Sequence, residues 1–384
     1  MTKRNKILKS FAAGFIALAP IVGCVSENNS EITSDQKEQG FYWTMNKTTT
    51  NSPSDTIIVT TSKIPKNPEL QDAISDYART LYQTNGLTTN YVELDSEECS
   101  AIFGVNSRNI GEEKTLDTII ESTKPRYIIL LGNEGIVPRP KRIFNLDGKV
   151  KSVPSDSWYC DANKDNIIDD GISIGRIDNY TGQTDAIVVA LKTATNIHDS
   201  GGLTIEKKVN AGMPRANYGI CKECIEQDQF IYDASQTDLL SFTGHGSPSG
   251  FYQGQGPYEF RNILLANDIK MLNLSKNNPL ILAFGPCSTA ADIPDSYVDG
   301  LSARLPVEFL KAGAAGFIGN TVAEGYSTKF KHEFDISLKN GSTLGEALSN
   351  AARKTSLENP ELIISTHQYQ LYGDPSIKVV DLTK

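Results

Sequence analysis

Two neighbouring stretches decide how this chain is interpreted: DLLSFTGHGSPSGFYQG, which begins at Asp238, and NNPLILAFGPCSTA, which ends at Ala290. In each, an apolar run of strand length breaks at glycine and is followed by one reactive side chain, His245 in the first and Cys287 in the second. Loops that follow the carboxyl ends of neighbouring strands in an open α/β sheet form the crevice where such folds bind ligands. We therefore expect His245 and Cys287 to face one cleft.

A thiol and an imidazole in one cleft can perform acyl transfer. The imidazole takes the proton of the thiol and later gives it to a leaving amine, so Cys287 is the candidate nucleophile and His245 the candidate general base and acid. The main-chain N–H groups of Gly246 and Cys287 are the candidates for an oxyanion hole. On residue types alone a second interpretation stays open, in which Cys287 is a small buried hydrophobic residue and His245 is structural.

Four motifs, in order, resemble the gingipain family of cysteine peptidases, which have a caspase-like fold. In chain order they are the segment from Ser155 to Asp178 (SDSWYCDANKDNIIDDGISIGRID), TGHGS, GPCS, and LYGDPSIKV, from Leu371 to Val379. The resemblance runs from about residue 56 to residue 380. It implies peptide-bond hydrolysis with Cys287 and His245 in the roles given above, and it names no third catalytic residue.

The N-terminus predicts export. Basic residues precede the apolar run FAAGFIALAPIVGC, which is too short for a comfortable membrane span and ends in Ile21-Val22-Gly23-Cys24, a sequence that resembles a prokaryotic lipobox. We expect residues 1–23 to be a signal peptide and Cys24 to be lipidated, which would place the protein on the outer face of the cell membrane. An ordinary signal peptide or an uncleaved anchor is the alternative.

The expected mature chain is acidic. Removing residues 1–23 removes four positive charges and lowers the formal net charge from −9 to −13, which argues against binding to nucleic acid. Residues 24–54 are polar without a sustained period and are expected to form a flexible tether. Residues 55–384 are expected to form the peptidase domain.

The order of predicted elements in this domain favours an α/β fold. Residues 55–61 and the run RYIILLGNEG, residues 126–135, are typical of strands, and the helical spacing in residues 68–85, with Gly86 after it, predicts a helix between them. Such alternation is typical of a central, mostly parallel sheet flanked by helices on both faces, as in the caspase-like fold.

An acidic loop inside the segment from Ser155 to Asp178 is a candidate calcium site. Oxygen ligands at odd-numbered spacing come from Asp161, Asn163, Asp165 and Asp169. The match is incomplete, since Asn166 occupies the position of the usual glycine and Ile172 that of the usual glutamate. A turn rich in Asp and Asn, without metal, explains the same composition.

Two further carboxylates are candidates for a substrate pocket that would accept Lys or Arg. Asp156 matches a motif Asp of the family, and Glu324 follows the strand predicted at residues 314–321. A buried structural role for Asp156 and a solvated loop for Glu324 are the alternatives.

The remaining polar residues receive structural interpretations. A disulfide between Cys221 and Cys224 is favoured, while Cys99 and Cys160 are left unassigned. We expect His198 at the polar end of a helix, and Asp374 and Pro375 to fix a turn.

The sequence thus predicts an exported, lipid-anchored cysteine endopeptidase that acts on peptides or proteins through a thioacyl-enzyme and requires no cofactor for its chemistry. Two alternatives stay open: a calcium-dependent surface binding protein with a degenerate peptidase fold, and a surface transpeptidase.

Overall fold

The computed structural model describes residues 54–105, 107–146, 149–180, 182–212, 227–254, 260–291, 303–322 and 327–381. All of these belong to one unit of the chain, which begins at Trp43. The predicted signal peptide, the lipidation site Cys24 and nearly all of the predicted tether lie outside the described residues.

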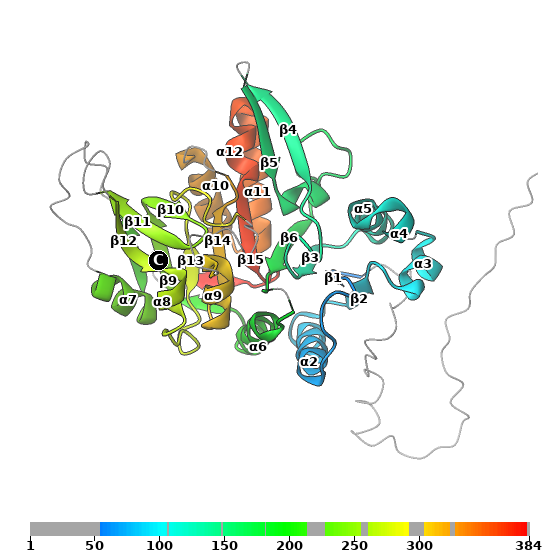
Figure 1. The fold of residues 1–384 in the computed structure, drawn as a ribbon, viewed down its shortest axis with the longest axis horizontal. Helices are drawn as coiled ribbons and strands as arrows, with labels where there is room; N and C mark the ends of the chain where they lie inside the picture. The colour runs from blue at the N-terminus through cyan, green and yellow to red at the C-terminus, as the bar shows by residue number, and fades with distance from the viewer. Residues whose placement is uncertain are drawn as a thin grey trace, which may run out of the picture. The chain divides into compact units, whose positions relative to one another are not determined.

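The described residues are built around a central sheet (Figure 1). Within these residues the sheet has nine strands, in the order β2-β1-β3-β6-β15-β14-β13-β9-β8. The strands are β1 (Thr56–Thr60), β2 (Thr89–Glu93), β3 (Tyr127–Leu131), β6 (Ser173–Ile177), β8 (Lys208–Gly212), β9 (Leu239–Thr243), β13 (Leu280–Leu282), β14 (Gly316–Asn320) and β15 (Tyr369–Gly373). Its strands pair mostly in parallel, and β15 runs antiparallel to β14. The prediction of a mostly parallel central sheet is confirmed.

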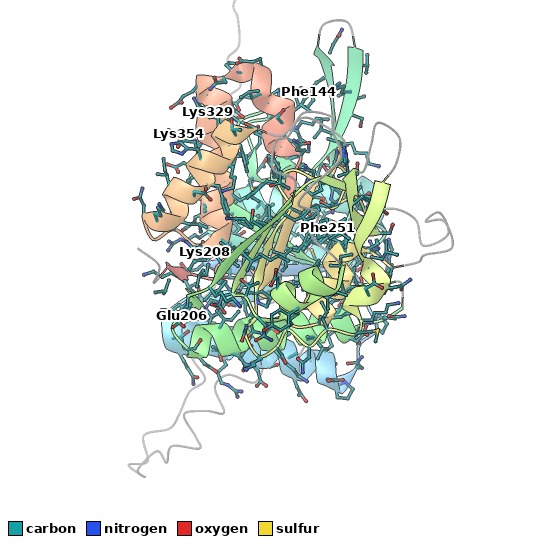
Figure 2. All side chains as sticks on the ribbon, turned by 90° about the vertical axis from the view of Figure 1, so that its left-hand side faces the viewer. Phe144, Glu206, Lys208, Phe251, Lys329 and Lys354 are labelled. Atoms are coloured by element: carbon teal, nitrogen blue, oxygen red, sulfur yellow. The ribbon has the colours of Figure 1, made fainter. Side chains whose placement is uncertain are left out.

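Helices pack on both faces of this sheet. Phe317 of β14 contacts Phe309 of α9, whereas Phe284, just past β13, contacts Phe330 and Phe334 of α10. The helices are α2 (Pro68–Asn85), α3 (Glu97–Phe103), α4 (Ser107–Ile110), α5 (Glu112–Thr123), α6 (Asp185–Asp199), α7 (Gln227–Ser235), α8 (Ala266–Ile269), α9 (Leu305–Lys311), α10 (Thr328–Lys339), α11 (Leu344–Glu358) and α12 (Ile363–His367), with 3-10 turns η2 (Asp156–Cys160) and η3 (Pro360–Leu362). Figure 2 shows Lys329 and Lys354 on the outer side of α10 and α11, where they pair with Glu358 and Glu333.

Helix ends follow the local rules that the sequence suggested. Gly86 ends α2 in the left-handed conformation, at φ 69°. Thr343 and Glu346 form a capping box at the start of α11, each side chain accepting a hydrogen bond from the main chain of the other residue.

Three small sheets complete the described structure. A three-stranded sheet of β10 (His245–Ser247), β11 (Gly250–Gly254) and β12 (Phe260–Leu265) follows β9, so His245 lies on a short strand where the sequence predicted a turn. The others are β4 (Lys141–Leu146) with β5 (Lys149–Pro154), and β7 (Leu203–Ile205) with β16 (Val379–Asp381).

The closing Gly-Asp-Pro-Ser motif is a packed turn. Asp374 accepts hydrogen bonds from the main-chain N–H and the hydroxyl of Ser376, as expected. It also pairs with His198 at 2.8 Å, and His198 is buried although the sequence suggested a polar helix end. A β-carbon placed on Gly175 would lie 2.3 Å from the carbonyl oxygen of Gly373, so the turn packs directly against β6.

No helix among the residues that the structure describes is both long enough and apolar enough to span a bilayer.

Candidate active site

The strands that carry the two reactive side chains are neighbours. β9 and β13 pair in parallel, with Leu239 beside Leu280 and Ser241 beside Leu282. Their C-terminal ends therefore lie at the same edge of the sheet, as the apolar runs predicted. His245 follows one end and Cys287 follows the other.

The loops beyond these strands are in direct contact. A β-carbon built on Gly246 would lie 2.5 Å from side-chain atoms of Pro286 and Thr289, and 3.2 Å from the carbonyl oxygen of Cys287. A β-carbon built on Gly285 would lie 3.1 Å from the methyl group of Thr243. The glycines that flank His245 and precede Cys287 thus allow the two main chains to approach closely.

Both reactive groups are accessible. The side chain of Cys287 is half-buried and its thiol is free, whereas His245 is exposed. The other thiols in the described residues, Cys99 and Cys160, are buried, and burial raises the pKa of both, that of Cys99 to about 11. Among these three, Cys287 is the thiol suited to react with a substrate.

The main chain around Cys287 has an unusual conformation. Ser288 adopts φ 52°, in the left-handed region that is strained for a residue with a β-carbon. No described residue accepts a hydrogen bond from the main-chain N–H of Cys287. A main-chain N–H of the nucleophilic residue itself, in the loop after a parallel strand, is suited to an oxyanion.

Asp156 lies in the interior and not on the wall of a pocket. It is fully buried, and its carboxylate makes a two-point contact with Arg176 at 2.6 and 2.8 Å and approaches Arg139 at 3.5 Å. Burial opposes the charged form, but the guanidinium groups of Arg176 and Arg139 hold the pKa of Asp156 below its usual value. The substrate-pocket interpretation of Asp156 is replaced by a buried ion pair, because no carboxylate oxygen reaches the surface.

The four residues of the candidate calcium site form a loop that is held by its own hydrogen bonds. Asp161 pairs with Arg142 and accepts the main-chain N–H groups of Asp165 and Asn166, while Asp169 accepts that of Ala162. The side-chain oxygen of Asn163 accepts a hydrogen bond from the main-chain N–H of Asp165, and its side-chain nitrogen donates to the carboxylate of Asp165. In the described residues, no group of three or more His, Cys, Asp or Glu side chains is arranged to hold a metal ion.

These contacts are those of an Asx-rich turn and account for the composition without a cation. Calcium binding at this loop stays a prediction.

Other predicted residues fall elsewhere. Glu324, Cys221 and Cys224 lie outside the described residues. His367 is buried, stacks on Trp158 with the ring centroids 3.8 Å apart, and bonds to the carbonyl oxygen of Asn166 at 3.0 Å.

Three residues to which the sequence assigned no functional role contact the loop of Cys287. They are Asn320 at the end of β14, Arg139 after β3, and Tyr372 on β15. The available signals were modest: Asn320 ends an apolar run, and Arg139 lies between two prolines in the loop that follows a buried strand.

Comparison with known proteins agrees with this geometry. The model of peptidase family C25 matches residues 227–380, which include both His245 and Cys287. The C-terminal part of this chain resembles peptidase family C25. The resemblance to gingipains predicted from the sequence is thereby confirmed.

Solved structures share the fold. The complex of Porphyromonas gingivalis RgpB pro- and mature domains matches with a TM-score of 0.58 at 15% identity, covering 84% of this chain and 79% of that chain. The Arg-specific cysteine proteinase gingipain R (RgpB) matches with a TM-score of 0.59 at 14% identity, covering 88% of this chain and 79% of that chain. A comparison with curated proteins gave no significant match. The chain therefore has the gingipain-like, caspase-like fold.

Proposed function

We propose that this chain is a cysteine peptidase with Cys287 as nucleophile and His245 as general base and acid. His245 takes the thiol proton, and the sulfur of Cys287 attacks the carbonyl carbon of a peptide bond. The amine leaves with the proton that His245 returns, which leaves a thioester on Cys287. Water, deprotonated by His245, then hydrolyses the thioester and restores the thiol.

The main-chain N–H groups of Cys287 and Gly246 are proposed to bind the oxyanion that forms on the carbonyl oxygen in each half of this cycle. The observation that carries the proposal is the close packing of Gly246 against the segment that contains Cys287, where a β-carbon on Gly246 would overlap Pro286 and Thr289, so the His and Cys loops meet at one edge of the sheet. The match to peptidase family C25 over the same residues supports it.

Peptides or proteins are the substrates that the family match suggests. Asp156 and Asp161 do not support a preference for Lys or Arg in the substrate. Each carboxylate already forms an ion pair with an arginine of the protein itself. Specificity is therefore best approached through a cleavage profile.

The test is covalent labelling. A peptidyl fluoromethyl ketone should alkylate the sulfur of Cys287 with loss of fluoride, so the peptide that contains Cys287 should gain the inhibitor mass less HF, and Cys287→Ala should abolish the adduct. His245→Ala should slow labelling at least about a hundredfold, since general-base catalysis is typically worth that much. His332→Ala, which removes an exposed histidine on α10, is the matched control and should label at the wild-type rate. A wild-type protein that stays unlabelled, or an adduct that persists in Cys287→Ala, would refute the assignment.

We further propose that the protein is exported and anchored through a lipid on Cys24, as the lipobox-like sequence suggests. Expression with an azide-bearing fatty acid should label the wild-type chain and leave Cys24→Ala unlabelled. Equal labelling of both would contradict this part of the proposal.

A further inference from the structure

The residues 284–290, named here the nucleophile segment, are held at their first end by Asn320. The side-chain nitrogen Nδ2 of Asn320 donates to the carbonyl oxygens of Pro286 at 2.9 Å and Phe284 at 3.4 Å. At the last residue of the segment, the main-chain carbonyl of Asn320 also accepts from the N–H of Ala290 at 2.8 Å. Asn320 is fully buried, so these bonds form away from competing water.

The other end of the nucleophile segment is held by a buried pair of side chains. The carbonyl oxygen of Ala290 accepts from the hydroxyl of Tyr372 at 2.9 Å and from Nη1 of Arg139 at 3.4 Å. Nη2 of Arg139 in turn donates to the Tyr372 hydroxyl at 2.7 Å. Asp156 and Glu134 balance the charge of Arg139.

The middle of the segment needs such support. Ser288 is in the left-handed conformation at φ 52°, and a strained residue of this kind persists only where the surrounding structure fixes it. It lies directly after Cys287, whose N–H has no acceptor among the described residues. The direction of that N–H therefore depends on how firmly the two ends of the segment are held.

We propose that Asn320 and the Arg139–Tyr372 pair are positioning residues, which hold the nucleophile segment so that the N–H of Cys287 is aimed at the oxyanion before the reaction begins. The inference rests on the proposed function. A donor held in place costs no reorganisation when negative charge develops, which is why fixed donors are effective in such sites. Asp156 acts one step further out, since it neutralises the arginine that reaches Ala290.

The experiment compares Tyr372→Phe with Tyr127→Phe. Both tyrosines are buried and lose one hydroxyl, but the hydroxyl of Tyr127 bonds to Glu346 at the start of α11 and contacts no part of the nucleophile segment. A peptide aldehyde forms a hemithioacetal whose oxygen occupies the oxyanion hole, whereas iodoacetamide alkylates the sulfur without using that hole. We expect Tyr372→Phe to weaken aldehyde affinity roughly tenfold, to lower kcat by a similar factor with KM nearly unchanged, and to leave the alkylation rate unchanged.

Asn320→Asp serves as a second variant. It keeps the shape of the side chain but replaces the donor Nδ2 by an acceptor opposite two carbonyl oxygens, and it should weaken aldehyde affinity more than Tyr372→Phe does. Tyr127→Phe should match the wild type in aldehyde affinity, kcat and alkylation. Equal aldehyde affinity in Tyr372→Phe and Tyr127→Phe would overturn the proposal.

Hydrogen exchange separates this inference from the proposed function. The amides of the nucleophile segment should exchange faster in Tyr372→Phe than in Tyr127→Phe or the wild type, whether or not the protein is a peptidase. If the wild-type protein neither cleaves peptides nor binds the aldehyde, the proposed function is refuted. The exchange rates would still show whether the two contacts anchor the segment. Unchanged exchange in both Tyr372→Phe and Asn320→Asp would refute the anchoring itself.

Discussion

Replacing Asp156 by Asn distinguishes a structural carboxylate from a substrate-binding one. Asp156 is fully buried and neutralises Arg176 directly and Arg139 at a slightly longer distance. The amide of Asn has nearly the same shape, but it offers one acceptor in place of two and carries no charge. Both guanidinium groups would then lose the negative charge that they share.

The expected loss of stability follows from the burial of the Asp156–Arg176 ion pair. Breaking a buried ion pair by removing one partner costs about 3–5 kcal/mol, and the retained acceptor places Asp156→Asn near the lower end, at about 3 kcal/mol. Asp335→Asn is the matched control, because Asp335 pairs with Lys331 on the surface of α10 and such pairs contribute about 0.5 kcal/mol or less.

Urea unfolding at pH 7 measures both values. The pKa of Asp156 is lowered in the folded protein, so its contribution to stability is present above the unfolded pKa of about 3.9 and is lost as pH falls through the folded value. The gap between wild type and Asp156→Asn should therefore narrow only below about pH 4. An unchanged stability with an altered preference for basic residues would refute the buried-pair interpretation and restore Asp156 to the substrate pocket.

Three further predictions follow from the site and its surroundings. Gly246→Ala should destabilise the fold by about 1–3 kcal/mol and abolish peptide cleavage, because the added β-carbon would overlap Pro286 and Thr289. A variant with wild-type stability and activity would contradict the close packing of the two loops. Burial lowers the pKa of His367 to about 3, so the unfolded chain binds a proton that the folded protein does not. As pH falls below about 6.5 the cost in stability approaches about 1.4 kcal/mol per pH unit and amounts to about 1 kcal/mol between pH 6.5 and 5.5, and His367→Gln should remove this contribution in urea unfolding over that range. Burial raises the pKa of Cys99 to about 11, so only about one Cys99 thiol in a thousand is ionised at pH 8. Peptide mapping after brief iodoacetamide treatment should therefore find Cys287 alkylated and Cys99 unmodified. Alkylation of Cys99 before Cys287 would be inconsistent with the structure.

The sequence predicted those parts of the structure that local patterns control. The apolar runs at residues 239–243 and 280–284 end in glycine, and this alone placed His245 and Cys287 at one edge of a parallel sheet. Gly86 after the helical spacing of residues 68–85 likewise predicted where that helix ends, and it ends α2 in the structure. Such features depend on short spacing and on backbone conformation.

The parts that were not predicted depend on tertiary contacts between distant residues. Asp156 pairs with Arg176, twenty positions away on another element, and nothing in the local sequence distinguishes this carboxylate from a solvent-exposed one. His198 is buried because Asp374 lies opposite it after the chain folds back. Tyr372 and Arg139 reach Ala290 from two other strands or their loops, and the sequence alone does not reveal that convergence.

The proposed mechanism requires the sulfur of Cys287 and the imidazole of His245 to act together on a peptide bond. A mixed peptide library, incubated with the wild-type protein, Cys287→Ala, His245→Ala and the control His332→Ala and analysed by mass spectrometry, tests this most directly. The wild type and His332→Ala should cut the same bonds at the same rate, and loss of either proposed catalytic group should lower the rate at least about a thousandfold. Repeating the wild-type reaction with a chelator tests the predicted calcium site. Cleavage by Cys287→Ala at the wild-type rate would contradict the claim.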